Sequence, residues 1–397
     1  MLAAMATAAE RLETYARLTV QVGLNLQPGQ VLGVSALIEH APLARAIARE
    51  AYRAGARYVD VLYSDQHVRR SHIELASEAE LGHSPPWLVH RFRALGEIGG
   101  AVCAITGNPE PELFADLDGE RVGNSRMREV AEATLALTDG LCNWTIVAYP
   151  NEGWAQTVFG EPDVERLWEA VGQAVRLDQP DPVAAWKEHI ERLQHRAAAL
   201  NERRFDELRY RGPGTDLTIG LHPDSEWQAA LDESQGIKHV ANMPTEEVFT
   251  TPDARRAEGT VRSTLPLQIQ GNIVRDLEVR FEGGRALLQA RDVVAPRGDG
   301  IGLVEAHRLA DRVPEALDVR LPEDRLRPAL VRVGDDRPVA EAVGQRERRL
   351  GDLAHACLAD ALAVEVGVEL RLRVAGDRTQ RASGLAEVAQ PLHEPGR

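Results

Sequence analysis

Cysteine is scarce in this sequence. Three cysteines, Cys103, Cys142 and Cys357, lie far apart in a chain of 397 residues. They are too few and too scattered to build a disulfide framework or a cysteine-rich zinc site. This usage favours a reducing compartment, so we predict a cytoplasmic protein without structural disulfide bonds.

Long apolar runs and a surplus of positive charge are also missing. The N-terminal stretch MLAAMATAAERLETYARL has no basic segment leading into an apolar one. Nowhere does an uncharged apolar run reach the roughly 18 residues that a membrane span needs. The formal net charge of -15 opposes binding to a phosphate backbone. We therefore predict neither a membrane nor a nucleic-acid partner.

Aromatic residues are absent from the C-terminal part of the chain. Every Phe, Tyr and Trp precedes Glu282, and the residues from there to Arg397 also contain no Lys, Met or Asn. Aromatic side chains usually contribute much of the area buried in a core. The end of the chain therefore differs in composition from everything before it.

An α/β pattern occupies the first half of the chain. Residues 30–63 read as an apolar run, a helix with apolar positions at helical spacing and a second apolar run, which is a βαβ unit. Further apolar runs at 101–106 and 143–149 alternate with helical stretches. This alternation predicts an open, mostly parallel α/β domain over residues 1–205.

A second domain follows a long polar helix predicted at 182–205. The segment RGPGTDLTIGL at 211–221 begins with residues typical of a turn and continues with the alternating apolar and polar residues of a strand. Strand-like segments follow it. We predict a β-rich α+β domain from 206 to 288. The residues 289–397 form a separate tail.

Familiar nucleotide and hydrolase motifs are missing from the whole sequence. There is no GxGxxG followed by an acidic residue, no P-loop, no HExxH and no GxSxG. The 12 histidines are spread singly along the chain. The usual support for an NAD-dependent enzyme, an ATPase or a serine hydrolase is therefore lacking.

One short segment, NMPTEEVFTTP at 242–252, places two carboxylates before an apolar pair. Thr251, Pro252 and Asp253 have the character of a helix start, which puts Glu246 and Glu247 on an extended segment before a helix. Adjacent side chains on an extended segment point in opposite directions, so only one of these carboxylates faces the interior. A buried carboxylate needs a partner, such as a divalent metal ion. A capped, solvated loop is the competing interpretation.

The segment NMPTEEVFTTPDARRAEGTVRSTLPL resembles the hallmark segment of the thermophilic-type aminopeptidase T family of metallopeptidases, which are leucyl aminopeptidase-like enzymes. Other segments resemble the same family and follow its order, and the resemblance runs from about residue 10 to about residue 288. They read VGLNLQPGQ, AYRAGARYVDVLYSD, NWTIVAYPNEGWAQTVFG, RLDQPDPVAAWKEHIERL, NERRFDELRYRGPGTDLTIGL and FEGG.

This resemblance implies an N-terminal α/β domain, a C-terminal catalytic domain and removal of N-terminal residues from peptide substrates. It also implies a homodimer and two divalent metal ions per site, zinc or cobalt, with magnesium or manganese as alternatives. Within the hallmark segment the metal-binding carboxylate corresponds to Glu247, and Glu246 is expected to point away.

The resemblance ends where the family's remaining metal ligands would begin. The LGEVALV-like, DENA-type and HVDF-like segments that carry those ligands have no counterpart after residue 289. The catalytic domain is therefore expected to be incomplete. Two hypotheses stand: a metal-dependent aminopeptidase, and a catalytically inactive remnant whose C-terminus is frameshifted or replaced. Because a two-metal hydrolase needs several ligands at once, we predict little or no turnover from the sequence as written.

Overall fold

A parallel sheet forms one side of the molecule in the computed structural model, which describes residues 7–263, 267–269 and 272–294. Its strand order is β10-β4-β3-β1-β2, and every neighbouring pair runs parallel. The strands are β1 (Val31–Leu37), β2 (Tyr58–Ser64), β3 (Ala101–Thr106), β4 (Asn143–Ala148) and β10 (Asn242–Met243). The parallel strands predicted from the apolar runs in the first half of the chain are confirmed.

Burial along these strands follows their position in the sheet. Alternate residues of β1 are buried, whereas β3 and β4 are buried at almost every position. Strands covered by helices on both faces carry such near-continuous apolar runs. This is why the sequence shows β3 and β4 as uninterrupted apolar segments.

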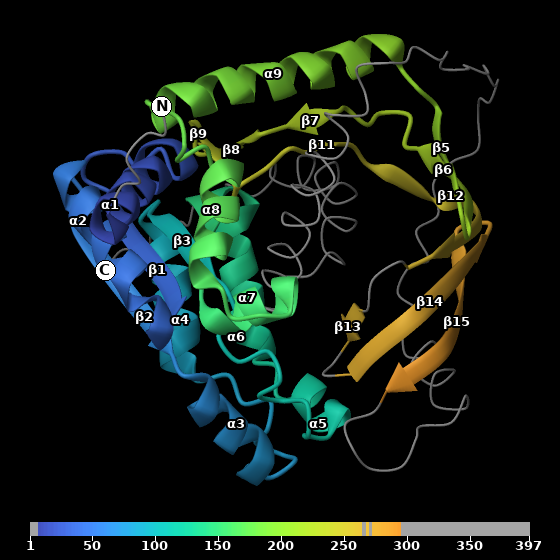
Figure 1. Cartoon of the computed structure of the whole chain (residues 1–397), viewed down its shortest axis with the longest axis horizontal. Helices are drawn as coiled ribbons and strands as arrows, with labels where there is room; N and C mark the ends of the chain where they lie inside the picture. Colours follow the sequence, from blue (N-terminus) through green and yellow to red (C-terminus); the bar gives the residue numbers. More distant parts are fainter. Residues whose placement is uncertain (1–6, 264–266, 270–271, 295–397) are drawn as a thin grey trace, which may run out of the picture.

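Helices surround the parallel sheet (Figure 1). They are α1 (Ala8–Leu18), α2 (Ala41–Arg53), α3 (Gln66–Leu75), α4 (Pro86–Glu97), α5 (Gly119–Asn124), α6 (Arg128–Ala136), α7 (Glu152–Phe159), α8 (Val164–Ala174) and α9 (Pro182–Arg203). Short helical turns lie at Thr19–Gly23, Ile38–His40 and Leu137–Leu141. Side chains cap several helix starts: Asp181 Oδ1, for example, accepts a hydrogen bond from the Ala184 amide at the start of α9.

The main core lies between the parallel sheet and α1, α2, α8 and α9. Tyr15, Trp154 and Trp186 are among its largest fully buried side chains. The Tyr15 hydroxyl accepts a hydrogen bond of 3.2 Å from the amide of Ala148 at the end of β4. The phenol therefore packs as an apolar group while its polar end stays hydrogen-bonded.

A second, antiparallel sheet lies on the other side of the molecule (Figure 1). Its strand order is β13-β14-β12-β6-β5, and β15 pairs with β14. The strands are β5 (Glu207–Gly212), β6 (Thr215–Leu221), β12 (Pro252–Arg262), β13 (Leu267–Ile269), β14 (Asn272–Glu282) and β15 (Arg285–Val294). The predicted combination of a parallel α/β part with a β-rich part is confirmed.

The helix predicted to start at Thr251 is wrong. Pro252–Arg262 is the strand β12, which pairs antiparallel with β6 on one side and β14 on the other. Gly259 in its middle has φ +112°, and a Cβ at this position would lie 2.0 Å from the carbonyl oxygen of Asp216. Pairing with distant strands overrides a local helix-start signal in this segment.

Two short strand pairs connect the sheets. β7 (Gln228–Ala229) pairs with β11 (Val248–Phe249), and β8 (Leu231–Ser234) pairs with β9 (Ile237–Val240). Helix α9 ends at Arg203 and β5 begins at Glu207, near the boundary proposed at residue 205. However, β10 returns from the later part of the chain into the parallel sheet. The division at 205 stays a prediction.

The proposed tail begins inside a strand, because β15 continues to Val294, past the predicted end of the second domain at 288. Residues 295–397, which make up most of the tail 289–397, lie outside the described residues. Among the helices that are described, none has the length and apolar composition required to cross a membrane.

Candidate functional site

The predicted metal ligand lies in the link between β10 and β11, which joins the parallel sheet to the β7–β11 pair. Met243 is buried and Thr245 is 6% exposed, so the start of this link is part of the interior. The Thr245 hydroxyl accepts a hydrogen bond of 3.3 Å from the backbone amide of Glu247. The two glutamates therefore follow directly after an anchored residue.

The two adjacent carboxylates have different surroundings. The side chain of Glu246 is 46% exposed, and its Oε1 accepts a hydrogen bond of 2.8 Å from the Arg176 guanidinium. Glu247 is partly buried. Its carboxylate has neither an ion pair nor a hydrogen bond within the described part of the chain. Of the pair, Glu247 is the more buried residue.

A buried histidine on α9 fixes the backbone beside Glu246. His189 is 1% exposed, and its Nε2–H donates a hydrogen bond of 2.8 Å to the carbonyl oxygen of Thr245. Its Nδ1 accepts a hydrogen bond of 3.1 Å from the Arg192 guanidinium. Burial lowers the pKa of His189 below its ordinary value. The imidazole is therefore neutral, which is the state in which one ring nitrogen donates and the other accepts.

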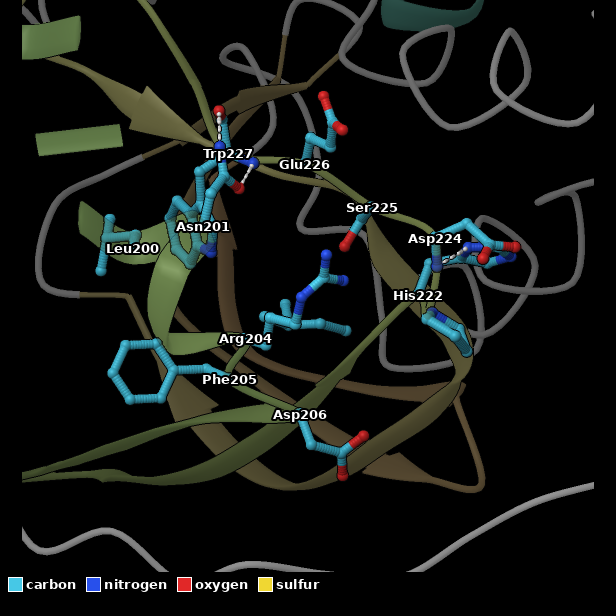
Figure 2. Close-up of a pocket in the computed structure, with 12 residues that line it drawn as sticks. Leu200, Asn201, Arg204, Phe205, Asp206, His222, Asp224, Ser225, Glu226 and Trp227 are labelled. Atoms are coloured by element: carbon cyan, nitrogen blue, oxygen red, sulfur yellow. Dashed lines mark hydrogen bonds between the residues drawn. The ribbon is translucent and has the colours of Figure 1, made fainter. Parts of the chain in front are cut away.

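A polar cavity of about 460 Å³ lies near the C-terminal end of α9. Figure 2 shows the Arg204 guanidinium pointing into this cavity. Asn201 and Trp227 hold one wall together through two hydrogen bonds of 2.7 and 3.0 Å, and Asp206 is engaged by Arg256. The lining consists of Leu200, Asn201, Arg204, Phe205, Asp206, Leu221, His222, Pro223, Asp224, Ser225, Glu226 and Trp227. Neither Glu246 nor Glu247 belongs to this lining.

The donor set for a metal ion is not complete in the described part. A carboxylate such as Glu247 is a suitable ligand for a divalent ion. However, no group of three or more His, Cys, Asp or Glu side chains within residues 7–263, 267–269 and 272–294 is arranged to hold one. These residues do not fit a metal centre by themselves. His307, His355 and His393, the histidines of the tail, lie outside the described residues.

Comparison with known proteins identifies the family. The model of the thermophilic metalloprotease (M29) family matches residues 8–294. The chain belongs to this family. It is 41% identical over 300 residues to aminopeptidase T of Thermus aquaticus, covering 74% of this chain and 72% of that protein. It is 36% identical over 288 residues to aminopeptidase 2 of Geobacillus stearothermophilus, with coverage of 70% and 69%.

A solved structure of a similar chain has the same fold. Wild-type AmpT from Thermus thermophilus aligns with a TM-score of 0.65 and 38% identity, and the alignment covers 76% of this chain and 74% of that one. By resemblance to these curated aminopeptidases, the chain is a metalloaminopeptidase-type enzyme. The family match ends at residue 294, the last residue that the structure describes.

The contacts of Arg176 and His189 were not predicted from the sequence. Both residues lie in the segment RLDQPDPVAAWKEHIERL, which resembles the aminopeptidase T family, but a single Arg and a single His carry no spacing signal. Their significance appears only when α8 and α9 bring them against Thr245 and Glu246. Nothing in the local sequence indicates which distant segment they contact.

Proposed function

We propose that this chain is a metal-dependent aminopeptidase that removes N-terminal residues from peptides, with Glu247 as one of its metal ligands. The observation that carries the proposal is the contrast between the two neighbouring carboxylates. Glu246 is bound by Arg176, whereas the partly buried Glu247 has no protein partner within the described residues. A partly buried carboxylate needs a compensating charge, and a divalent ion supplies one.

Several finer properties belong to the same proposal. The resemblance supports two divalent ions per site, zinc or cobalt, with magnesium or manganese as alternatives. It also supports a homodimer, and the low cysteine content supports a cytoplasmic location. The described residues contribute one ligand that matches the family, Glu247. Metal analysis of the purified full-length protein tests this part of the proposal.

The decisive experiment is an assay of the full-length protein on leucine and arginine aminoacyl substrates with added zinc or cobalt. The proposed function requires turnover, and it requires Glu247→Ala to lower kcat/KM by more than about 10²-fold, because losing a ligand weakens ion binding. Glu188→Ala is the matched control, since Glu188 is an exposed carboxylate on α9. Wild-type protein without turnover would favour the inactive remnant instead.

A further inference from the structure

The Arg176 guanidinium is held by three contacts: an aromatic ring, a backbone carbonyl and a carboxylate. It lies just after α8 with a backbone φ of +62°, and its side chain is 15% exposed. The guanidinium lies 5.0 Å from the ring centroid of Trp186 and donates 3.0 Å to the carbonyl oxygen of Ala174. The remaining contact is the hydrogen bond to Glu246. The stacking, the backbone contact and the ion pair together hold this guanidinium in one place.

Trp186 and His189, one turn apart on α9, lie against Arg176 and the Thr245–Glu246 segment. The Trp186 indole is fully buried and donates a hydrogen bond of 2.8 Å to the carbonyl oxygen of Val175. Its ring meets the His189 ring edge to face, with centroids 5.4 Å apart. His189 Nε2 also lies 3.5 Å from Glu246 Oε1. Thr245 and Glu246 are thus held through a backbone carbonyl and a side chain at once.

The same face of α9 also holds the chain on the other side of Glu247. Leu193 and Ala197 follow His189 at intervals of one helical turn and pack with Ala229 and the partly buried Val248. Val248 pairs with Ala229 in the β7–β11 ladder. Glu247 therefore lies between two anchored neighbours, and both anchors belong to one stripe along a single rigid helix.

We propose that Arg176 and His189 are positioning residues that fix the direction of the Glu247 carboxylate by clamping Thr245 and Glu246. Within the described part of the chain, no hydrogen bond or ion pair joins either residue to Glu247. They act on the backbone that carries the Glu247 side chain. His189 binds the carbonyl of Thr245, and Arg176 binds the carboxylate of Glu246. This inference rests on the proposed role of Glu247 for its effect on turnover, but the clamp itself is a property of the fold.

The test combines hydrogen–deuterium exchange with steady-state kinetics on full-length protein. In Arg176→Ala and His189→Ala, exchange in the peptide spanning 243–249 should rise by about tenfold or more, because local opening becomes easier. The kcat should fall by about 10²-fold while KM changes less than about twofold, the pattern of a displaced reactive group. Arg176→Lys and His189→Gln, which keep a donor for Glu246 and for Thr245, should restore much of both signals.

Arg166→Ala is the matched control. The Arg166 guanidinium lies 4.0 Å from the ring centroid of Phe159 and 3.0 Å from Glu161, so this variant removes the same kinds of contact away from residues 243–249. It should leave exchange in 243–249 unchanged. The proposal would be overturned if both alanine variants exchanged at the wild-type rate in 243–249. It would also be overturned if exchange rose equally in the peptide spanning 207–221. Wild-type protein without Glu247-dependent turnover would refute the proposed function. The difference in exchange between the alanine variants and wild type would then still test whether Arg176 and His189 hold Thr245 and Glu246.

Discussion

At the scale of single residues, buried histidines keep segments of backbone in place. His40 donates 2.8 Å to the carbonyl oxygen of Gly107, and His239 donates 3.1 Å from Nδ1 to that of Ile237. Both rings are fully buried, as His189 nearly is. Burial is the largest cause lowering the pKa of each of the three. Each therefore contributes to the fold as a neutral ring.

These lowered pKa values predict that stability decreases in mild acid. The unfolded chain takes up protons near the ordinary histidine pKa of 6.5, whereas the folded protein takes them up only at lower pH. Stability is therefore full above that value and is lost as the pH falls toward the folded pKa values. The thermal unfolding midpoint should be lower at about pH 5.5 than at about pH 7.5.

His239→Asn separates one contribution from the others, since the amide nitrogen can replace Nδ1 as the donor to Ile237. Its unfolding midpoint should depend less on pH than that of the wild type. Paired carboxylates such as Asp206 and Glu165 have lowered pKa values and titrate below this range, so they do not disturb the comparison. An unfolding midpoint that is equal or higher in mild acid would contradict the prediction.

At the scale of elements, the sequence predicted the helices and strands that carry an apolar pattern of their own. β1, α2 and β2 follow one another along the chain, and their apolar spacing is enough to define them. The helix predicted in place of β12 was wrong because this strand is formed by pairing with β6 and β14. Those strands lie in separate segments, and no local sequence pattern indicates that they pair with β12. β10 was missed for a related reason, since a two-residue strand is defined only by its neighbour β4.

The candidate site divides in the same way between local and distant signals. Alternation and the family resemblance together select Glu247 over Glu246 within one segment. Glu247 is the less exposed of the two residues, and its role as a metal ligand stays a prediction. The cluster around it required α8 and α9 to be placed in space. Arg176 and Glu246 are far apart along the chain, so only the folded structure brings them together.

Replacing either of two glycines in neighbouring helices by alanine should change stability, in opposite directions. A Cβ on Gly153 in α7 would lie 1.9 Å from the carbonyl oxygen of Pro109, which is rigid backbone. The nearest atom to a Cβ on Gly172 in α8 is 3.9 Å away. Gly153→Ala should destabilise the protein by about 1–3 kcal/mol through overpacking. Gly172→Ala should stabilise it by about 0.5–1 kcal/mol through helix propensity.

Urea unfolding of both variants at one temperature tests this pair, because the midpoint reports stability when the slope is unchanged. Agreement requires shifts in opposite directions. A Gly153→Ala midpoint at or above the wild-type value would show that the α7 start can move away from Pro109, and the close approach would then have no energetic consequence.

At the scale of the whole molecule, α9 and β10 make the two sheets one structure. α9 runs from the parallel sheet toward the antiparallel sheet (Figure 1). β10 pairs with β4, and the adjacent Val240 carbonyl accepts a hydrogen bond of 2.8 Å from the Thr145 hydroxyl. Val240 and Met243 also belong to the main core. The first sheet is therefore completed by residues beyond the proposed boundary at 205.

Truncation tests this dependence. A fragment of residues 1–205 lacks β10 and leaves the β4 edge and part of the core uncovered, so it should be poorly soluble and bind the apolar dye ANS. A fragment of residues 1–294 retains these contacts and is the matched control. The same solubility and the same dye binding for both fragments would contradict the role assigned to β10.

The return of β10 also has a consequence during synthesis on the ribosome. Strands β1 to β4 emerge long before Asn242 and Met243, and translation adds roughly 5–20 residues per second. Until those two residues leave the exit tunnel, the nascent chain carries an open β4 edge that no later strand yet protects. The interval is a window in which chaperones or a neighbouring nascent chain can bind, and slow translation of residues 205–243 lengthens it.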